Sequence, residues 1–253
     1  MTAVVGLTTG VLAAGDAKHP KQLEWEMEGP FGTFDKASAQ RGWQVYRNVC
    51  ASCHSLKYFR FRNLKGIGYG DKMIEAFAAE YTVPGGPDEF GDPTTRDALP
   101  RDSFPSPYPN EQAARASNGG ALPPDLSLMT KARHDGINYL YSLLSGYEEA
   151  PADVTLPVGK YYNPYFPGKA ISMPAPLMEG IVTYEDGTEA TVDQMARDVT
   201  TFLHYVAEPK MEDRKRTGIA VLLFLAVMVV LSYLSMKKIW KPVKEGRNVM
   251  DEE

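Results

Sequence analysis

Five consecutive residues, Cys50-Ala51-Ser52-Cys53-His54, have the types and spacing for covalent attachment of a cofactor and for metal ligation. Two thiols separated by two residues can each form a thioether bond to the edge of a porphyrin, and the adjacent imidazole then lies under the iron. This order of residues is typical of the attachment site of a c-type haem. The motif therefore predicts one covalently attached haem c, with His54 as its proximal iron ligand.

The motif has three alternative interpretations: a thioredoxin-like dithiol, half of a zinc site, or two buried structural cysteines. A structural zinc site needs four ligands, but the chain has only two cysteines, both of them in the motif. The other histidines, His19, His134 and His204, are scattered along the chain and form no second pair. A haem is the better interpretation.

The iron face opposite the proximal histidine is either open, which suits ligand or peroxide chemistry, or filled by methionine, which suits electron transfer at high potential. Of 11 methionines, Met173 lies in a proline-rich loop, Ile-Ser-Met-Pro-Ala-Pro at 171–176, that could reach across the haem. A methionine is otherwise most often core filler. From the pattern alone, Met173 is the preferred distal ligand.

The motif must be positioned by helices. A helix is predicted from about Asp35 to the motif, with Ala39, Trp43 and Tyr46 on one face. Gly42 inside it costs about 1 kcal/mol relative to alanine, which close packing of another helix would explain. The predicted partner is the helix 191–207, with an apolar stripe formed by Val199, Phe202, Leu203 and Val206.

Elsewhere the chain alternates short helices with loops. We expect helices at 110–116, 127–133 and 136–145, and a surface loop at 84–110, where proline, glycine and aspartate gather. The glycines at 66–70 have no Gly-Lys-Ser/Thr ending, so they are no phosphate loop. The predicted fold is mainly α, with long ordered loops and one C-terminal transmembrane helix.

The stretch Thr217–Met236 is long and apolar enough to cross a membrane, because 20 helical residues span roughly 30 Å. The flank with more Lys and Arg tends to stay in the cytoplasm, and here it is the C-terminal one. Residues 2–14 resemble the apolar part of an export signal without its basic start. The predicted organisation is an export-signal remnant at 1–17, a haem domain at 18–209, an anchor at 210–237 and a cytoplasmic tail at 238–253.

The charge is distributed unevenly. Residues 1–209 hold 18 Lys and Arg against 26 Asp and Glu, whereas residues 210–253 hold 9 against 6. An acidic body argues against a nucleic-acid partner and suits a basic protein partner. The acidic pairs that could attract such a partner are Asp88-Glu89, Glu148-Glu149 and Glu185-Asp186.

Beyond the motif, the sequence contains several distinctive runs. They are Arg-Gly-Trp-Gln-Val-Tyr at 41–46, Pro-Asn-Glu-Gln-Ala-Ala-Arg-Ala at 109–116, Gly-Ala-Leu-Pro-Pro-Asp-Leu-Ser at 120–127, Lys-Ala-Arg-His at 131–134, Tyr-Asn-Pro-Tyr-Phe-Pro-Gly at 162–168 and Val-Thr-Tyr-Glu-Asp-Gly-Thr at 182–188. In these runs the sequence resembles the cytochrome c₁ family, the haem c subunits of the cytochrome bc₁ complex (ubiquinol–cytochrome c oxidoreductase). The resemblance covers nearly the whole chain from Gly29 to Trp240.

The resemblance implies a role for each matching residue. Cys50 and Cys53 would hold the haem, and His54 and Met173 would ligate its iron. Arg133 would neutralise a haem propionate by paired hydrogen bonds, where the alternative is a solvent-facing charge. The positions expected to line the pocket are Asn118, Pro124 and Tyr139. Some bacterial relatives carry an extra cysteine pair in their loops and this chain does not, so Pro164, Pro167, Pro174 and Pro176 could stiffen the loop before Met173 instead.

The resemblance also implies a fold, a class I cytochrome c-like helical haem domain with long ordered loops, and a function. The chain would relay single electrons from the Rieske iron–sulfur protein to a soluble cytochrome c, within a respiratory or photosynthetic enzyme, while quinol is oxidised in cytochrome b. It would thus be the electron-transfer subunit of an oxidoreductase, part of a dimeric multi-subunit complex, with its haem domain in the periplasm and its C-terminus in the cytoplasm. The alternative is an independent membrane-anchored cytochrome c.

Overall fold

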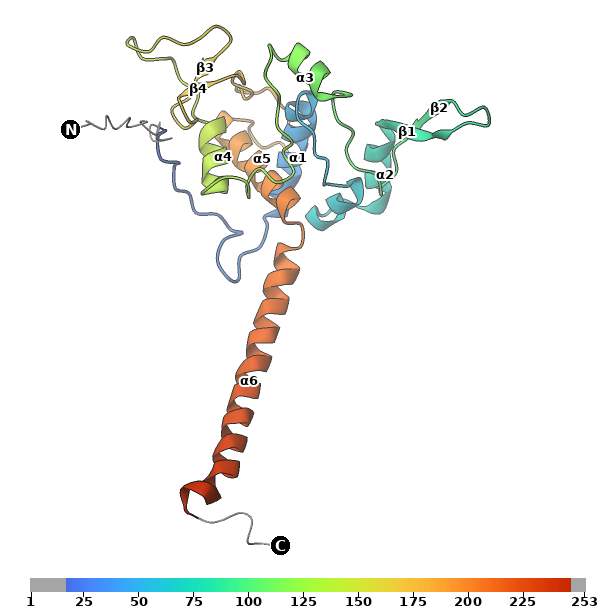
Figure 1. Ribbon diagram of the computed structural model, residues 1–253. Helices are drawn as coiled ribbons and strands as arrows, with labels where there is room; N and C mark the ends of the chain where they lie inside the picture. Colours follow the sequence, from blue (N-terminus) through green and yellow to red (C-terminus); the bar gives the residue numbers. More distant parts are fainter. Residues whose placement is uncertain (1–16, 247–253) are drawn as a thin grey trace, which may run out of the picture. The chain divides into compact units, whose positions relative to one another are not determined.

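The structure is a computed structural model that describes residues 17–246. It is mainly helical, as predicted (Figure 1). The described residues form two compact units: one comprises residues 17–27 together with Phe34–Pro209, and the other comprises Glu28–Thr33 together with residues 210–246. The export signal predicted at 1–17 lies outside the described residues, apart from residue 17.

Helix α1, Lys36–Asn48, leads directly to the motif. The carboxylate of Asp35 caps its first turn by accepting from the Ala37 N–H, which satisfies one of the free donors at a helix start. Ala39, Trp43 and Tyr46 are buried on one face, as the periodicity predicts. The prediction of this helix is confirmed.

Helix α5, Val192–Ala207, packs along α1 with Thr191 as its N-cap (Figure 1). Its predicted apolar stripe is buried. A Cβ placed on Gly42 would lie 2.0 Å from the Asp198 carbonyl oxygen and 2.7 Å from the Phe202 Cβ. Only a glycine therefore allows this approach of the two helices, which confirms the reason given for Gly42.

A buried charge also joins α1 to α5. The carboxylate of Asp198 is fully buried and accepts hydrogen bonds from the Ser38 hydroxyl at 2.7 Å and from the Arg41 guanidinium at 2.9 Å. Such a pair is costly to break, because either partner alone would be a buried charge without compensation. The network fixes how the two helices meet.

Beyond this helix pair, aromatic rings fill the core beside the motif. The 3₁₀ helix η2, Phe61–Ile67, and helix α2, Asp71–Ala79, pack together there. The rings in contact are those of Trp43, Tyr46, Phe59, Phe61, Phe104 and Phe202.

The loop predicted at 84–110 contains regular structure. Strands β1, Thr82–Pro87, and β2, Pro93–Asp97, form an antiparallel hairpin with an irregularity between Pro84 and Pro87. Proline is tolerated at strand ends and at irregularities, so the prolines did not prevent pairing. Helix α3, Glu111–Ser117, follows, close to its predicted place.

Helix α4, Gly136–Leu144, packs on α5, with Leu140, Leu143 and Leu144 buried as predicted and Tyr139 half-buried. The helix predicted at 127–133 is wrong, because this segment forms turns. The Ser127 hydroxyl at its start accepts from the Tyr58 N–H of another segment, and Asp135 has a left-handed backbone with φ of 51°. Helix α4 therefore begins only at Gly136.

A short ribbon precedes Met173. Strand β3, Tyr161–Tyr162, pairs antiparallel with β4, Ala170–Ile171, which ends two residues before Met173. The loop between them turns at Gly168, with φ of 76°, and Lys169, with φ of 57°.

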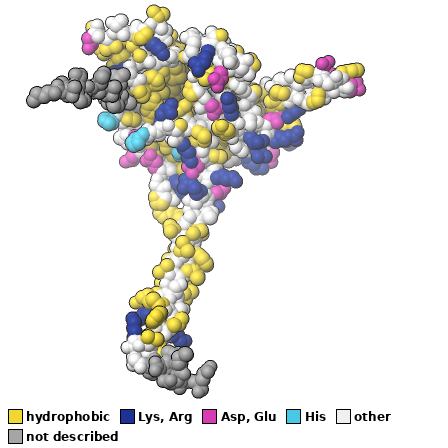
Figure 2. Space-filling model, in the orientation of Figure 1, with side chains coloured by type: hydrophobic (Ala, Val, Ile, Leu, Met, Phe, Trp, Pro, Cys, Tyr) yellow, Lys and Arg dark blue, Asp and Glu magenta, His cyan; other side chains and the backbone are white. Residues whose placement is uncertain are grey.

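The second unit contains helix α6, Met211–Lys244, which includes the stretch predicted to span a membrane. At 34 residues it is about 50 Å long. Among the described residues it is the one helix long and apolar enough to cross a bilayer. Figure 2 shows hydrophobic side chains covering most of its surface, with Lys and Arg near its end.

Candidate functional site

The motif occupies a single tight turn at the end of α1. Cys50–Ser52 form the 3₁₀ helix η1, and the Cys50 carbonyl accepts from the N–H groups of Cys53, at 3.1 Å, and His54, at 2.9 Å. Both cysteines are partly exposed free thiols. Burial, and then the neighbouring Cys53, raise the pKa of Cys50 to about 12.

His54 is oriented by a backbone carbonyl 70 residues away. Its Nδ1 lies 2.8 Å from the Pro124 oxygen. A carbonyl only accepts, so Nδ1 carries the proton and Nε2 keeps its lone pair. Burial also lowers the pKa of His54, although the hydrogen bond to Pro124 opposes this. The ring is thus a neutral imidazole with one nitrogen free to ligate a metal, supported by a hydrogen bond of the kind that orients metal-bound histidines.

Asp125 holds the two segments of this contact together. Its carboxylate accepts from the Ser55 hydroxyl at 2.7 Å, the Lys57 N–H at 2.9 Å and the Ser127 N–H at 2.9 Å. The Ser55 carbonyl accepts from the Leu126 N–H at 2.9 Å. The residues after His54 are therefore bonded at several points to the residues after Pro124.

The other side of the motif is fixed from α1 and from the loop before α3. The Tyr46 hydroxyl donates to the His54 carbonyl at 2.9 Å. The Tyr108 hydroxyl lies 3.9 Å from the Cys53 sulfur and accepts from the Asn118 amide at 3.1 Å. Asn118, a predicted pocket residue, is thereby linked to the motif.

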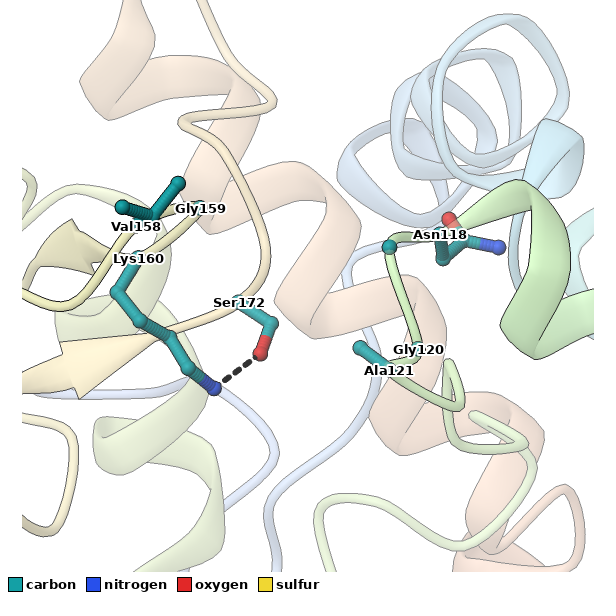
Figure 3. Close-up of a pocket in the computed structure, with 8 residues that line it drawn as sticks. Asn118, Gly120, Ala121, Val158, Gly159, Lys160 and Ser172 are labelled. Carbon is teal, nitrogen blue, oxygen red and sulfur yellow. Dashed lines mark hydrogen bonds between the residues drawn. The ribbon is translucent and has the colours of Figure 1, made fainter.

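A cavity of about 320 Å³ lies beside Asn118 (Figure 3). One wall consists of residues 118–121, and the other consists of residues 158–160 and Ser172. Ser172 is adjacent to Met173, and its hydroxyl accepts from the Lys160 ammonium at 2.6 Å. The cavity is within the size range of small-molecule and cofactor sites. It places the segment of the predicted distal ligand opposite a segment linked to the motif.

Met173 itself is half-buried, and its carbonyl accepts from the Tyr147 hydroxyl at 3.0 Å. Arg133 and Tyr139 form a separate pair. The Arg133 guanidinium is exposed and donates to the Ala132 carbonyl at 3.1 Å. Burial raises the pKa of Tyr139, and the nearby charge of Arg133 opposes this.

These residues fit a haem. The motif offers two thiols and an oriented imidazole, and Ser172, the residue before Met173, lines the cavity. Within residues 17–246, no group of three or more His, Cys, Asp or Glu side chains gathers that could hold a metal ion by itself. The zinc interpretation therefore has no structural support among the described residues.

Comparisons with known proteins agree with this chemistry. The model of the cytochrome C1 family matches residues 25–243. The chain belongs to the cytochrome c₁ family. Membership implies a haem cofactor and a role in electron transfer, as a subunit of an oxidoreductase.

Three relatives show the extent of the similarity. The chain is 49% identical over 240 residues to "Cytochrome c1, heme protein, mitochondrial" of Saccharomyces cerevisiae, covering 94% of this chain and 78% of that protein. It is 46% identical over 257 residues to "Cytochrome c1" of Rhodospirillum rubrum, covering 92% and 94%. It is 50% identical over 243 residues to "Cytochrome b/c1" of Bradyrhizobium diazoefficiens, covering 87% of this chain but 35% of that longer protein.

Four residues that position the site were not identified from the sequence: Tyr46, Tyr108, Asp125 and Tyr147. Tyr46 was predicted as a buried residue of the helix, but not as a hydrogen-bond donor to His54. Only Asp125 had a local signal. An aspartate directly after two prolines and two residues before a serine commonly bonds nearby backbone N–H groups. The tyrosine hydroxyls act on residues 8 to 55 positions away, which no local pattern reveals.

Proposed function

We propose that the chain carries one haem c, bound by thioether bonds to Cys50 and Cys53 and ligated by His54 and Met173, and relays single electrons. The observation that carries this proposal is the 2.8 Å contact from His54 Nδ1 to the Pro124 oxygen, which leaves Nε2 free beside the two thiols. When bound, the haem supplies the one-electron change between ferric and ferrous iron.

The residues of the chain hold this centre rigid. The Pro124 carbonyl prevents rotation of the His54 ring, and the Tyr46 hydroxyl fixes the His54 backbone. A rigid ligand set favours rapid electron transfer, because little rearrangement accompanies the change in iron charge. Ligation of the iron by methionine and histidine would raise the reduction potential of the haem. A high potential suits a carrier that acts late in a series of electron transfers.

In this proposal the electron comes from the Rieske iron–sulfur protein and passes to a soluble cytochrome c. Cytochrome b, rather than this chain, provides the quinol-oxidising site, and the subunits form a dimeric complex. The names of the relatives, one of which is "Cytochrome b/c1", support such an assembly. Helix α6 crosses the inner membrane with the C-terminus in the cytoplasm and the haem domain in the periplasm. The Lys and Arg residues after the apolar stretch support this orientation.

One acidic pair is favourably placed to attract a basic cytochrome c. Glu148 and Glu149 are exposed and directly follow Tyr147, whose hydroxyl bonds the Met173 carbonyl. Asp186, in contrast, is paired with Arg41 at 3.0 Å. We therefore place electrostatic steering at Glu148 and Glu149.

The ligand assignment is tested by replacing Met173 with leucine. The variant should lose the methionine-to-iron charge-transfer band and show a much lower midpoint potential, because the thioether is removed while the side-chain volume is nearly kept. Met178→Leu is the matched control, because Met178 is 60% exposed and close in sequence. A band that survives in Met173→Leu would assign the distal position to another residue.

The partner assignment is tested by cytochrome c reduction at increasing salt. The second-order rate should fall steeply with ionic strength. The double variant Glu148→Gln/Glu149→Gln should reduce the low-salt rate, whereas Asp88→Asn/Glu89→Gln on the β1–β2 hairpin should not. A rate that is independent of salt would show that the acidic surface has no role in docking.

A further inference from the structure

The loop that carries Met173 must be stiffened without a disulfide, because both cysteines of the chain lie in the haem motif. Pro174 and Pro176 restrict the backbone after the methionine. A proline limits the local conformation of a loop but does not determine where the loop lies on the protein. Some other contact has to hold this loop in place.

The hydrogen bond from the Tyr147 hydroxyl to the Met173 carbonyl is such a contact, at 3.0 Å and across 26 residues. Tyr147 is half-buried. It holds the backbone of the very residue that is proposed as the distal ligand.

The segment that links α4 to Tyr147 is itself rigid. Tyr147 comes three residues after the end of α4, and a Cβ on the preceding Gly146 would lie 2.3 Å from the Ser142 carbonyl oxygen and 2.4 Å from the Tyr165 ring. The end of α4 thus packs directly against Tyr165, so that the backbone leading to Tyr147 has little freedom.

The segment before Met173 is also attached to α4. Asn163 is fully buried, and its amide donates to the Leu143 carbonyl at 2.8 Å. The Asn163 N–H donates to the Lys169 carbonyl at 3.0 Å, just before β4. Asn163 therefore attaches the segment before Met173 to α4, and Tyr147, just beyond α4, attaches the segment at Met173 itself.

We propose that Tyr147 is a positioning residue for the distal ligand, and that its hydrogen bond to Met173 opposes displacement of the methionine by outside ligands. The proposal rests on the proposed function, because it requires Met173 to be bound to the iron. An outside ligand can bind only when the methionine has left, so its apparent affinity is proportional to the fraction of open molecules.

The test replaces Tyr147 with phenylalanine in the full-length, haem-loaded chain. Imidazole is titrated into the ferric protein, and its binding is followed by loss of the methionine-to-iron charge-transfer band. The apparent affinity for imidazole should rise by about twofold to tenfold, the range expected when one neutral hydrogen bond is lost. Tyr161→Phe is the matched control, because Tyr161 lies on β3 of the same ribbon with its side chain 45% exposed.

Imidazole affinity equal to that of the unsubstituted chain would overturn the proposal, even if Tyr147→Phe lowered the thermal unfolding midpoint, because the tyrosine would then serve stability alone. An equal rise in Tyr161→Phe would also overturn it. Met173→Leu separates this result from failure of the proposed function. If Met173→Leu keeps the band, the ligand assignment is wrong; if it loses the band while Tyr147→Phe binds imidazole normally, only the role of Tyr147 is wrong.

Discussion

Replacing Gly42 with alanine should destabilise the haem domain, although alanine is the better helix former. The added Cβ would lie 2.0 Å from the Asp198 carbonyl oxygen, whereas an ordinary contact is 3.4–4 Å. The obstruction is backbone, so α1 and α5 must separate locally by at least 1.4 Å, the difference between 2.0 and 3.4 Å. Such overpacking costs roughly 1–3 kcal/mol. Movement would also strain the buried pair between Arg41 and Asp198.

Because the obstructing atom is backbone and cannot rotate away, the upper end of this range applies, and the net loss is about 2 kcal/mol after the gain in helix propensity of about 1 kcal/mol is subtracted. For a domain of this size the thermal midpoint should fall by roughly 4–8 °C. The assay is thermal unfolding of the haem-loaded chain, followed by circular dichroism. Gly86→Ala is the control, because an added Cβ there meets nothing within 4 Å. A midpoint that stays the same or rises in Gly42→Ala would refute the close approach of the helices.

Three further predictions concern the residues around the motif. Asp125→Ala removes the acceptor of three hydrogen bonds, and the unfolding free energy should fall by about 3 kcal/mol or more, measured by denaturant unfolding. Burial raises the pKa of Asp125, but its hydrogen bonds outweigh this and hold the pKa below the usual value. The contribution of Asp125 to the unfolding free energy should therefore be present above about pH 4 and be lost as the pH falls through the lower pKa of the folded state. Asp125→Asn should make the unfolding free energy depend less on pH in this acid range. Arg41→Gln leaves Asp198 without its cation and should cost about 3–5 kcal/mol in the same assay. Tyr46→Phe should cost about 1 kcal/mol and broaden the haem absorption bands, because the His54 backbone loses its donor.

The long helices could be predicted because their signals are local. α1 has an aspartate N-cap and buried residues at helical spacing, and α5 has a threonine N-cap and a regular apolar stripe. Gly42 predicted that the two helices are in contact, because a glycine inside a strong helix pattern is explained by close packing of a neighbouring helix. The attachment site and the proximal ligand could also be predicted from the sequence, because Cys50–His54 form one contiguous pattern, and their roles stay a prediction.

The contacts that position the site depend on tertiary structure. His54 meets Pro124 across 70 residues, and Tyr147 meets Met173 across 26. The segment 127–133 shows how such contacts override local preference. Its composition favours a helix, but the Ser127 hydroxyl accepts from the Tyr58 N–H, 69 residues away. The start of the segment is thereby attached to another part of the chain.

The proposed haem centre can be tested by a redox titration of the purified haem-loaded chain, followed by its optical spectrum. The titration should show a single one-electron transition, with a slope of about 59 mV per tenfold change in the ratio of oxidised to reduced protein. The reduced form should have a c-type α-band, and the midpoint potential should be positive, as methionine–histidine ligation implies. The absence of that band, or a midpoint well below zero, would contradict a high-potential haem held by Cys50, Cys53, His54 and Met173.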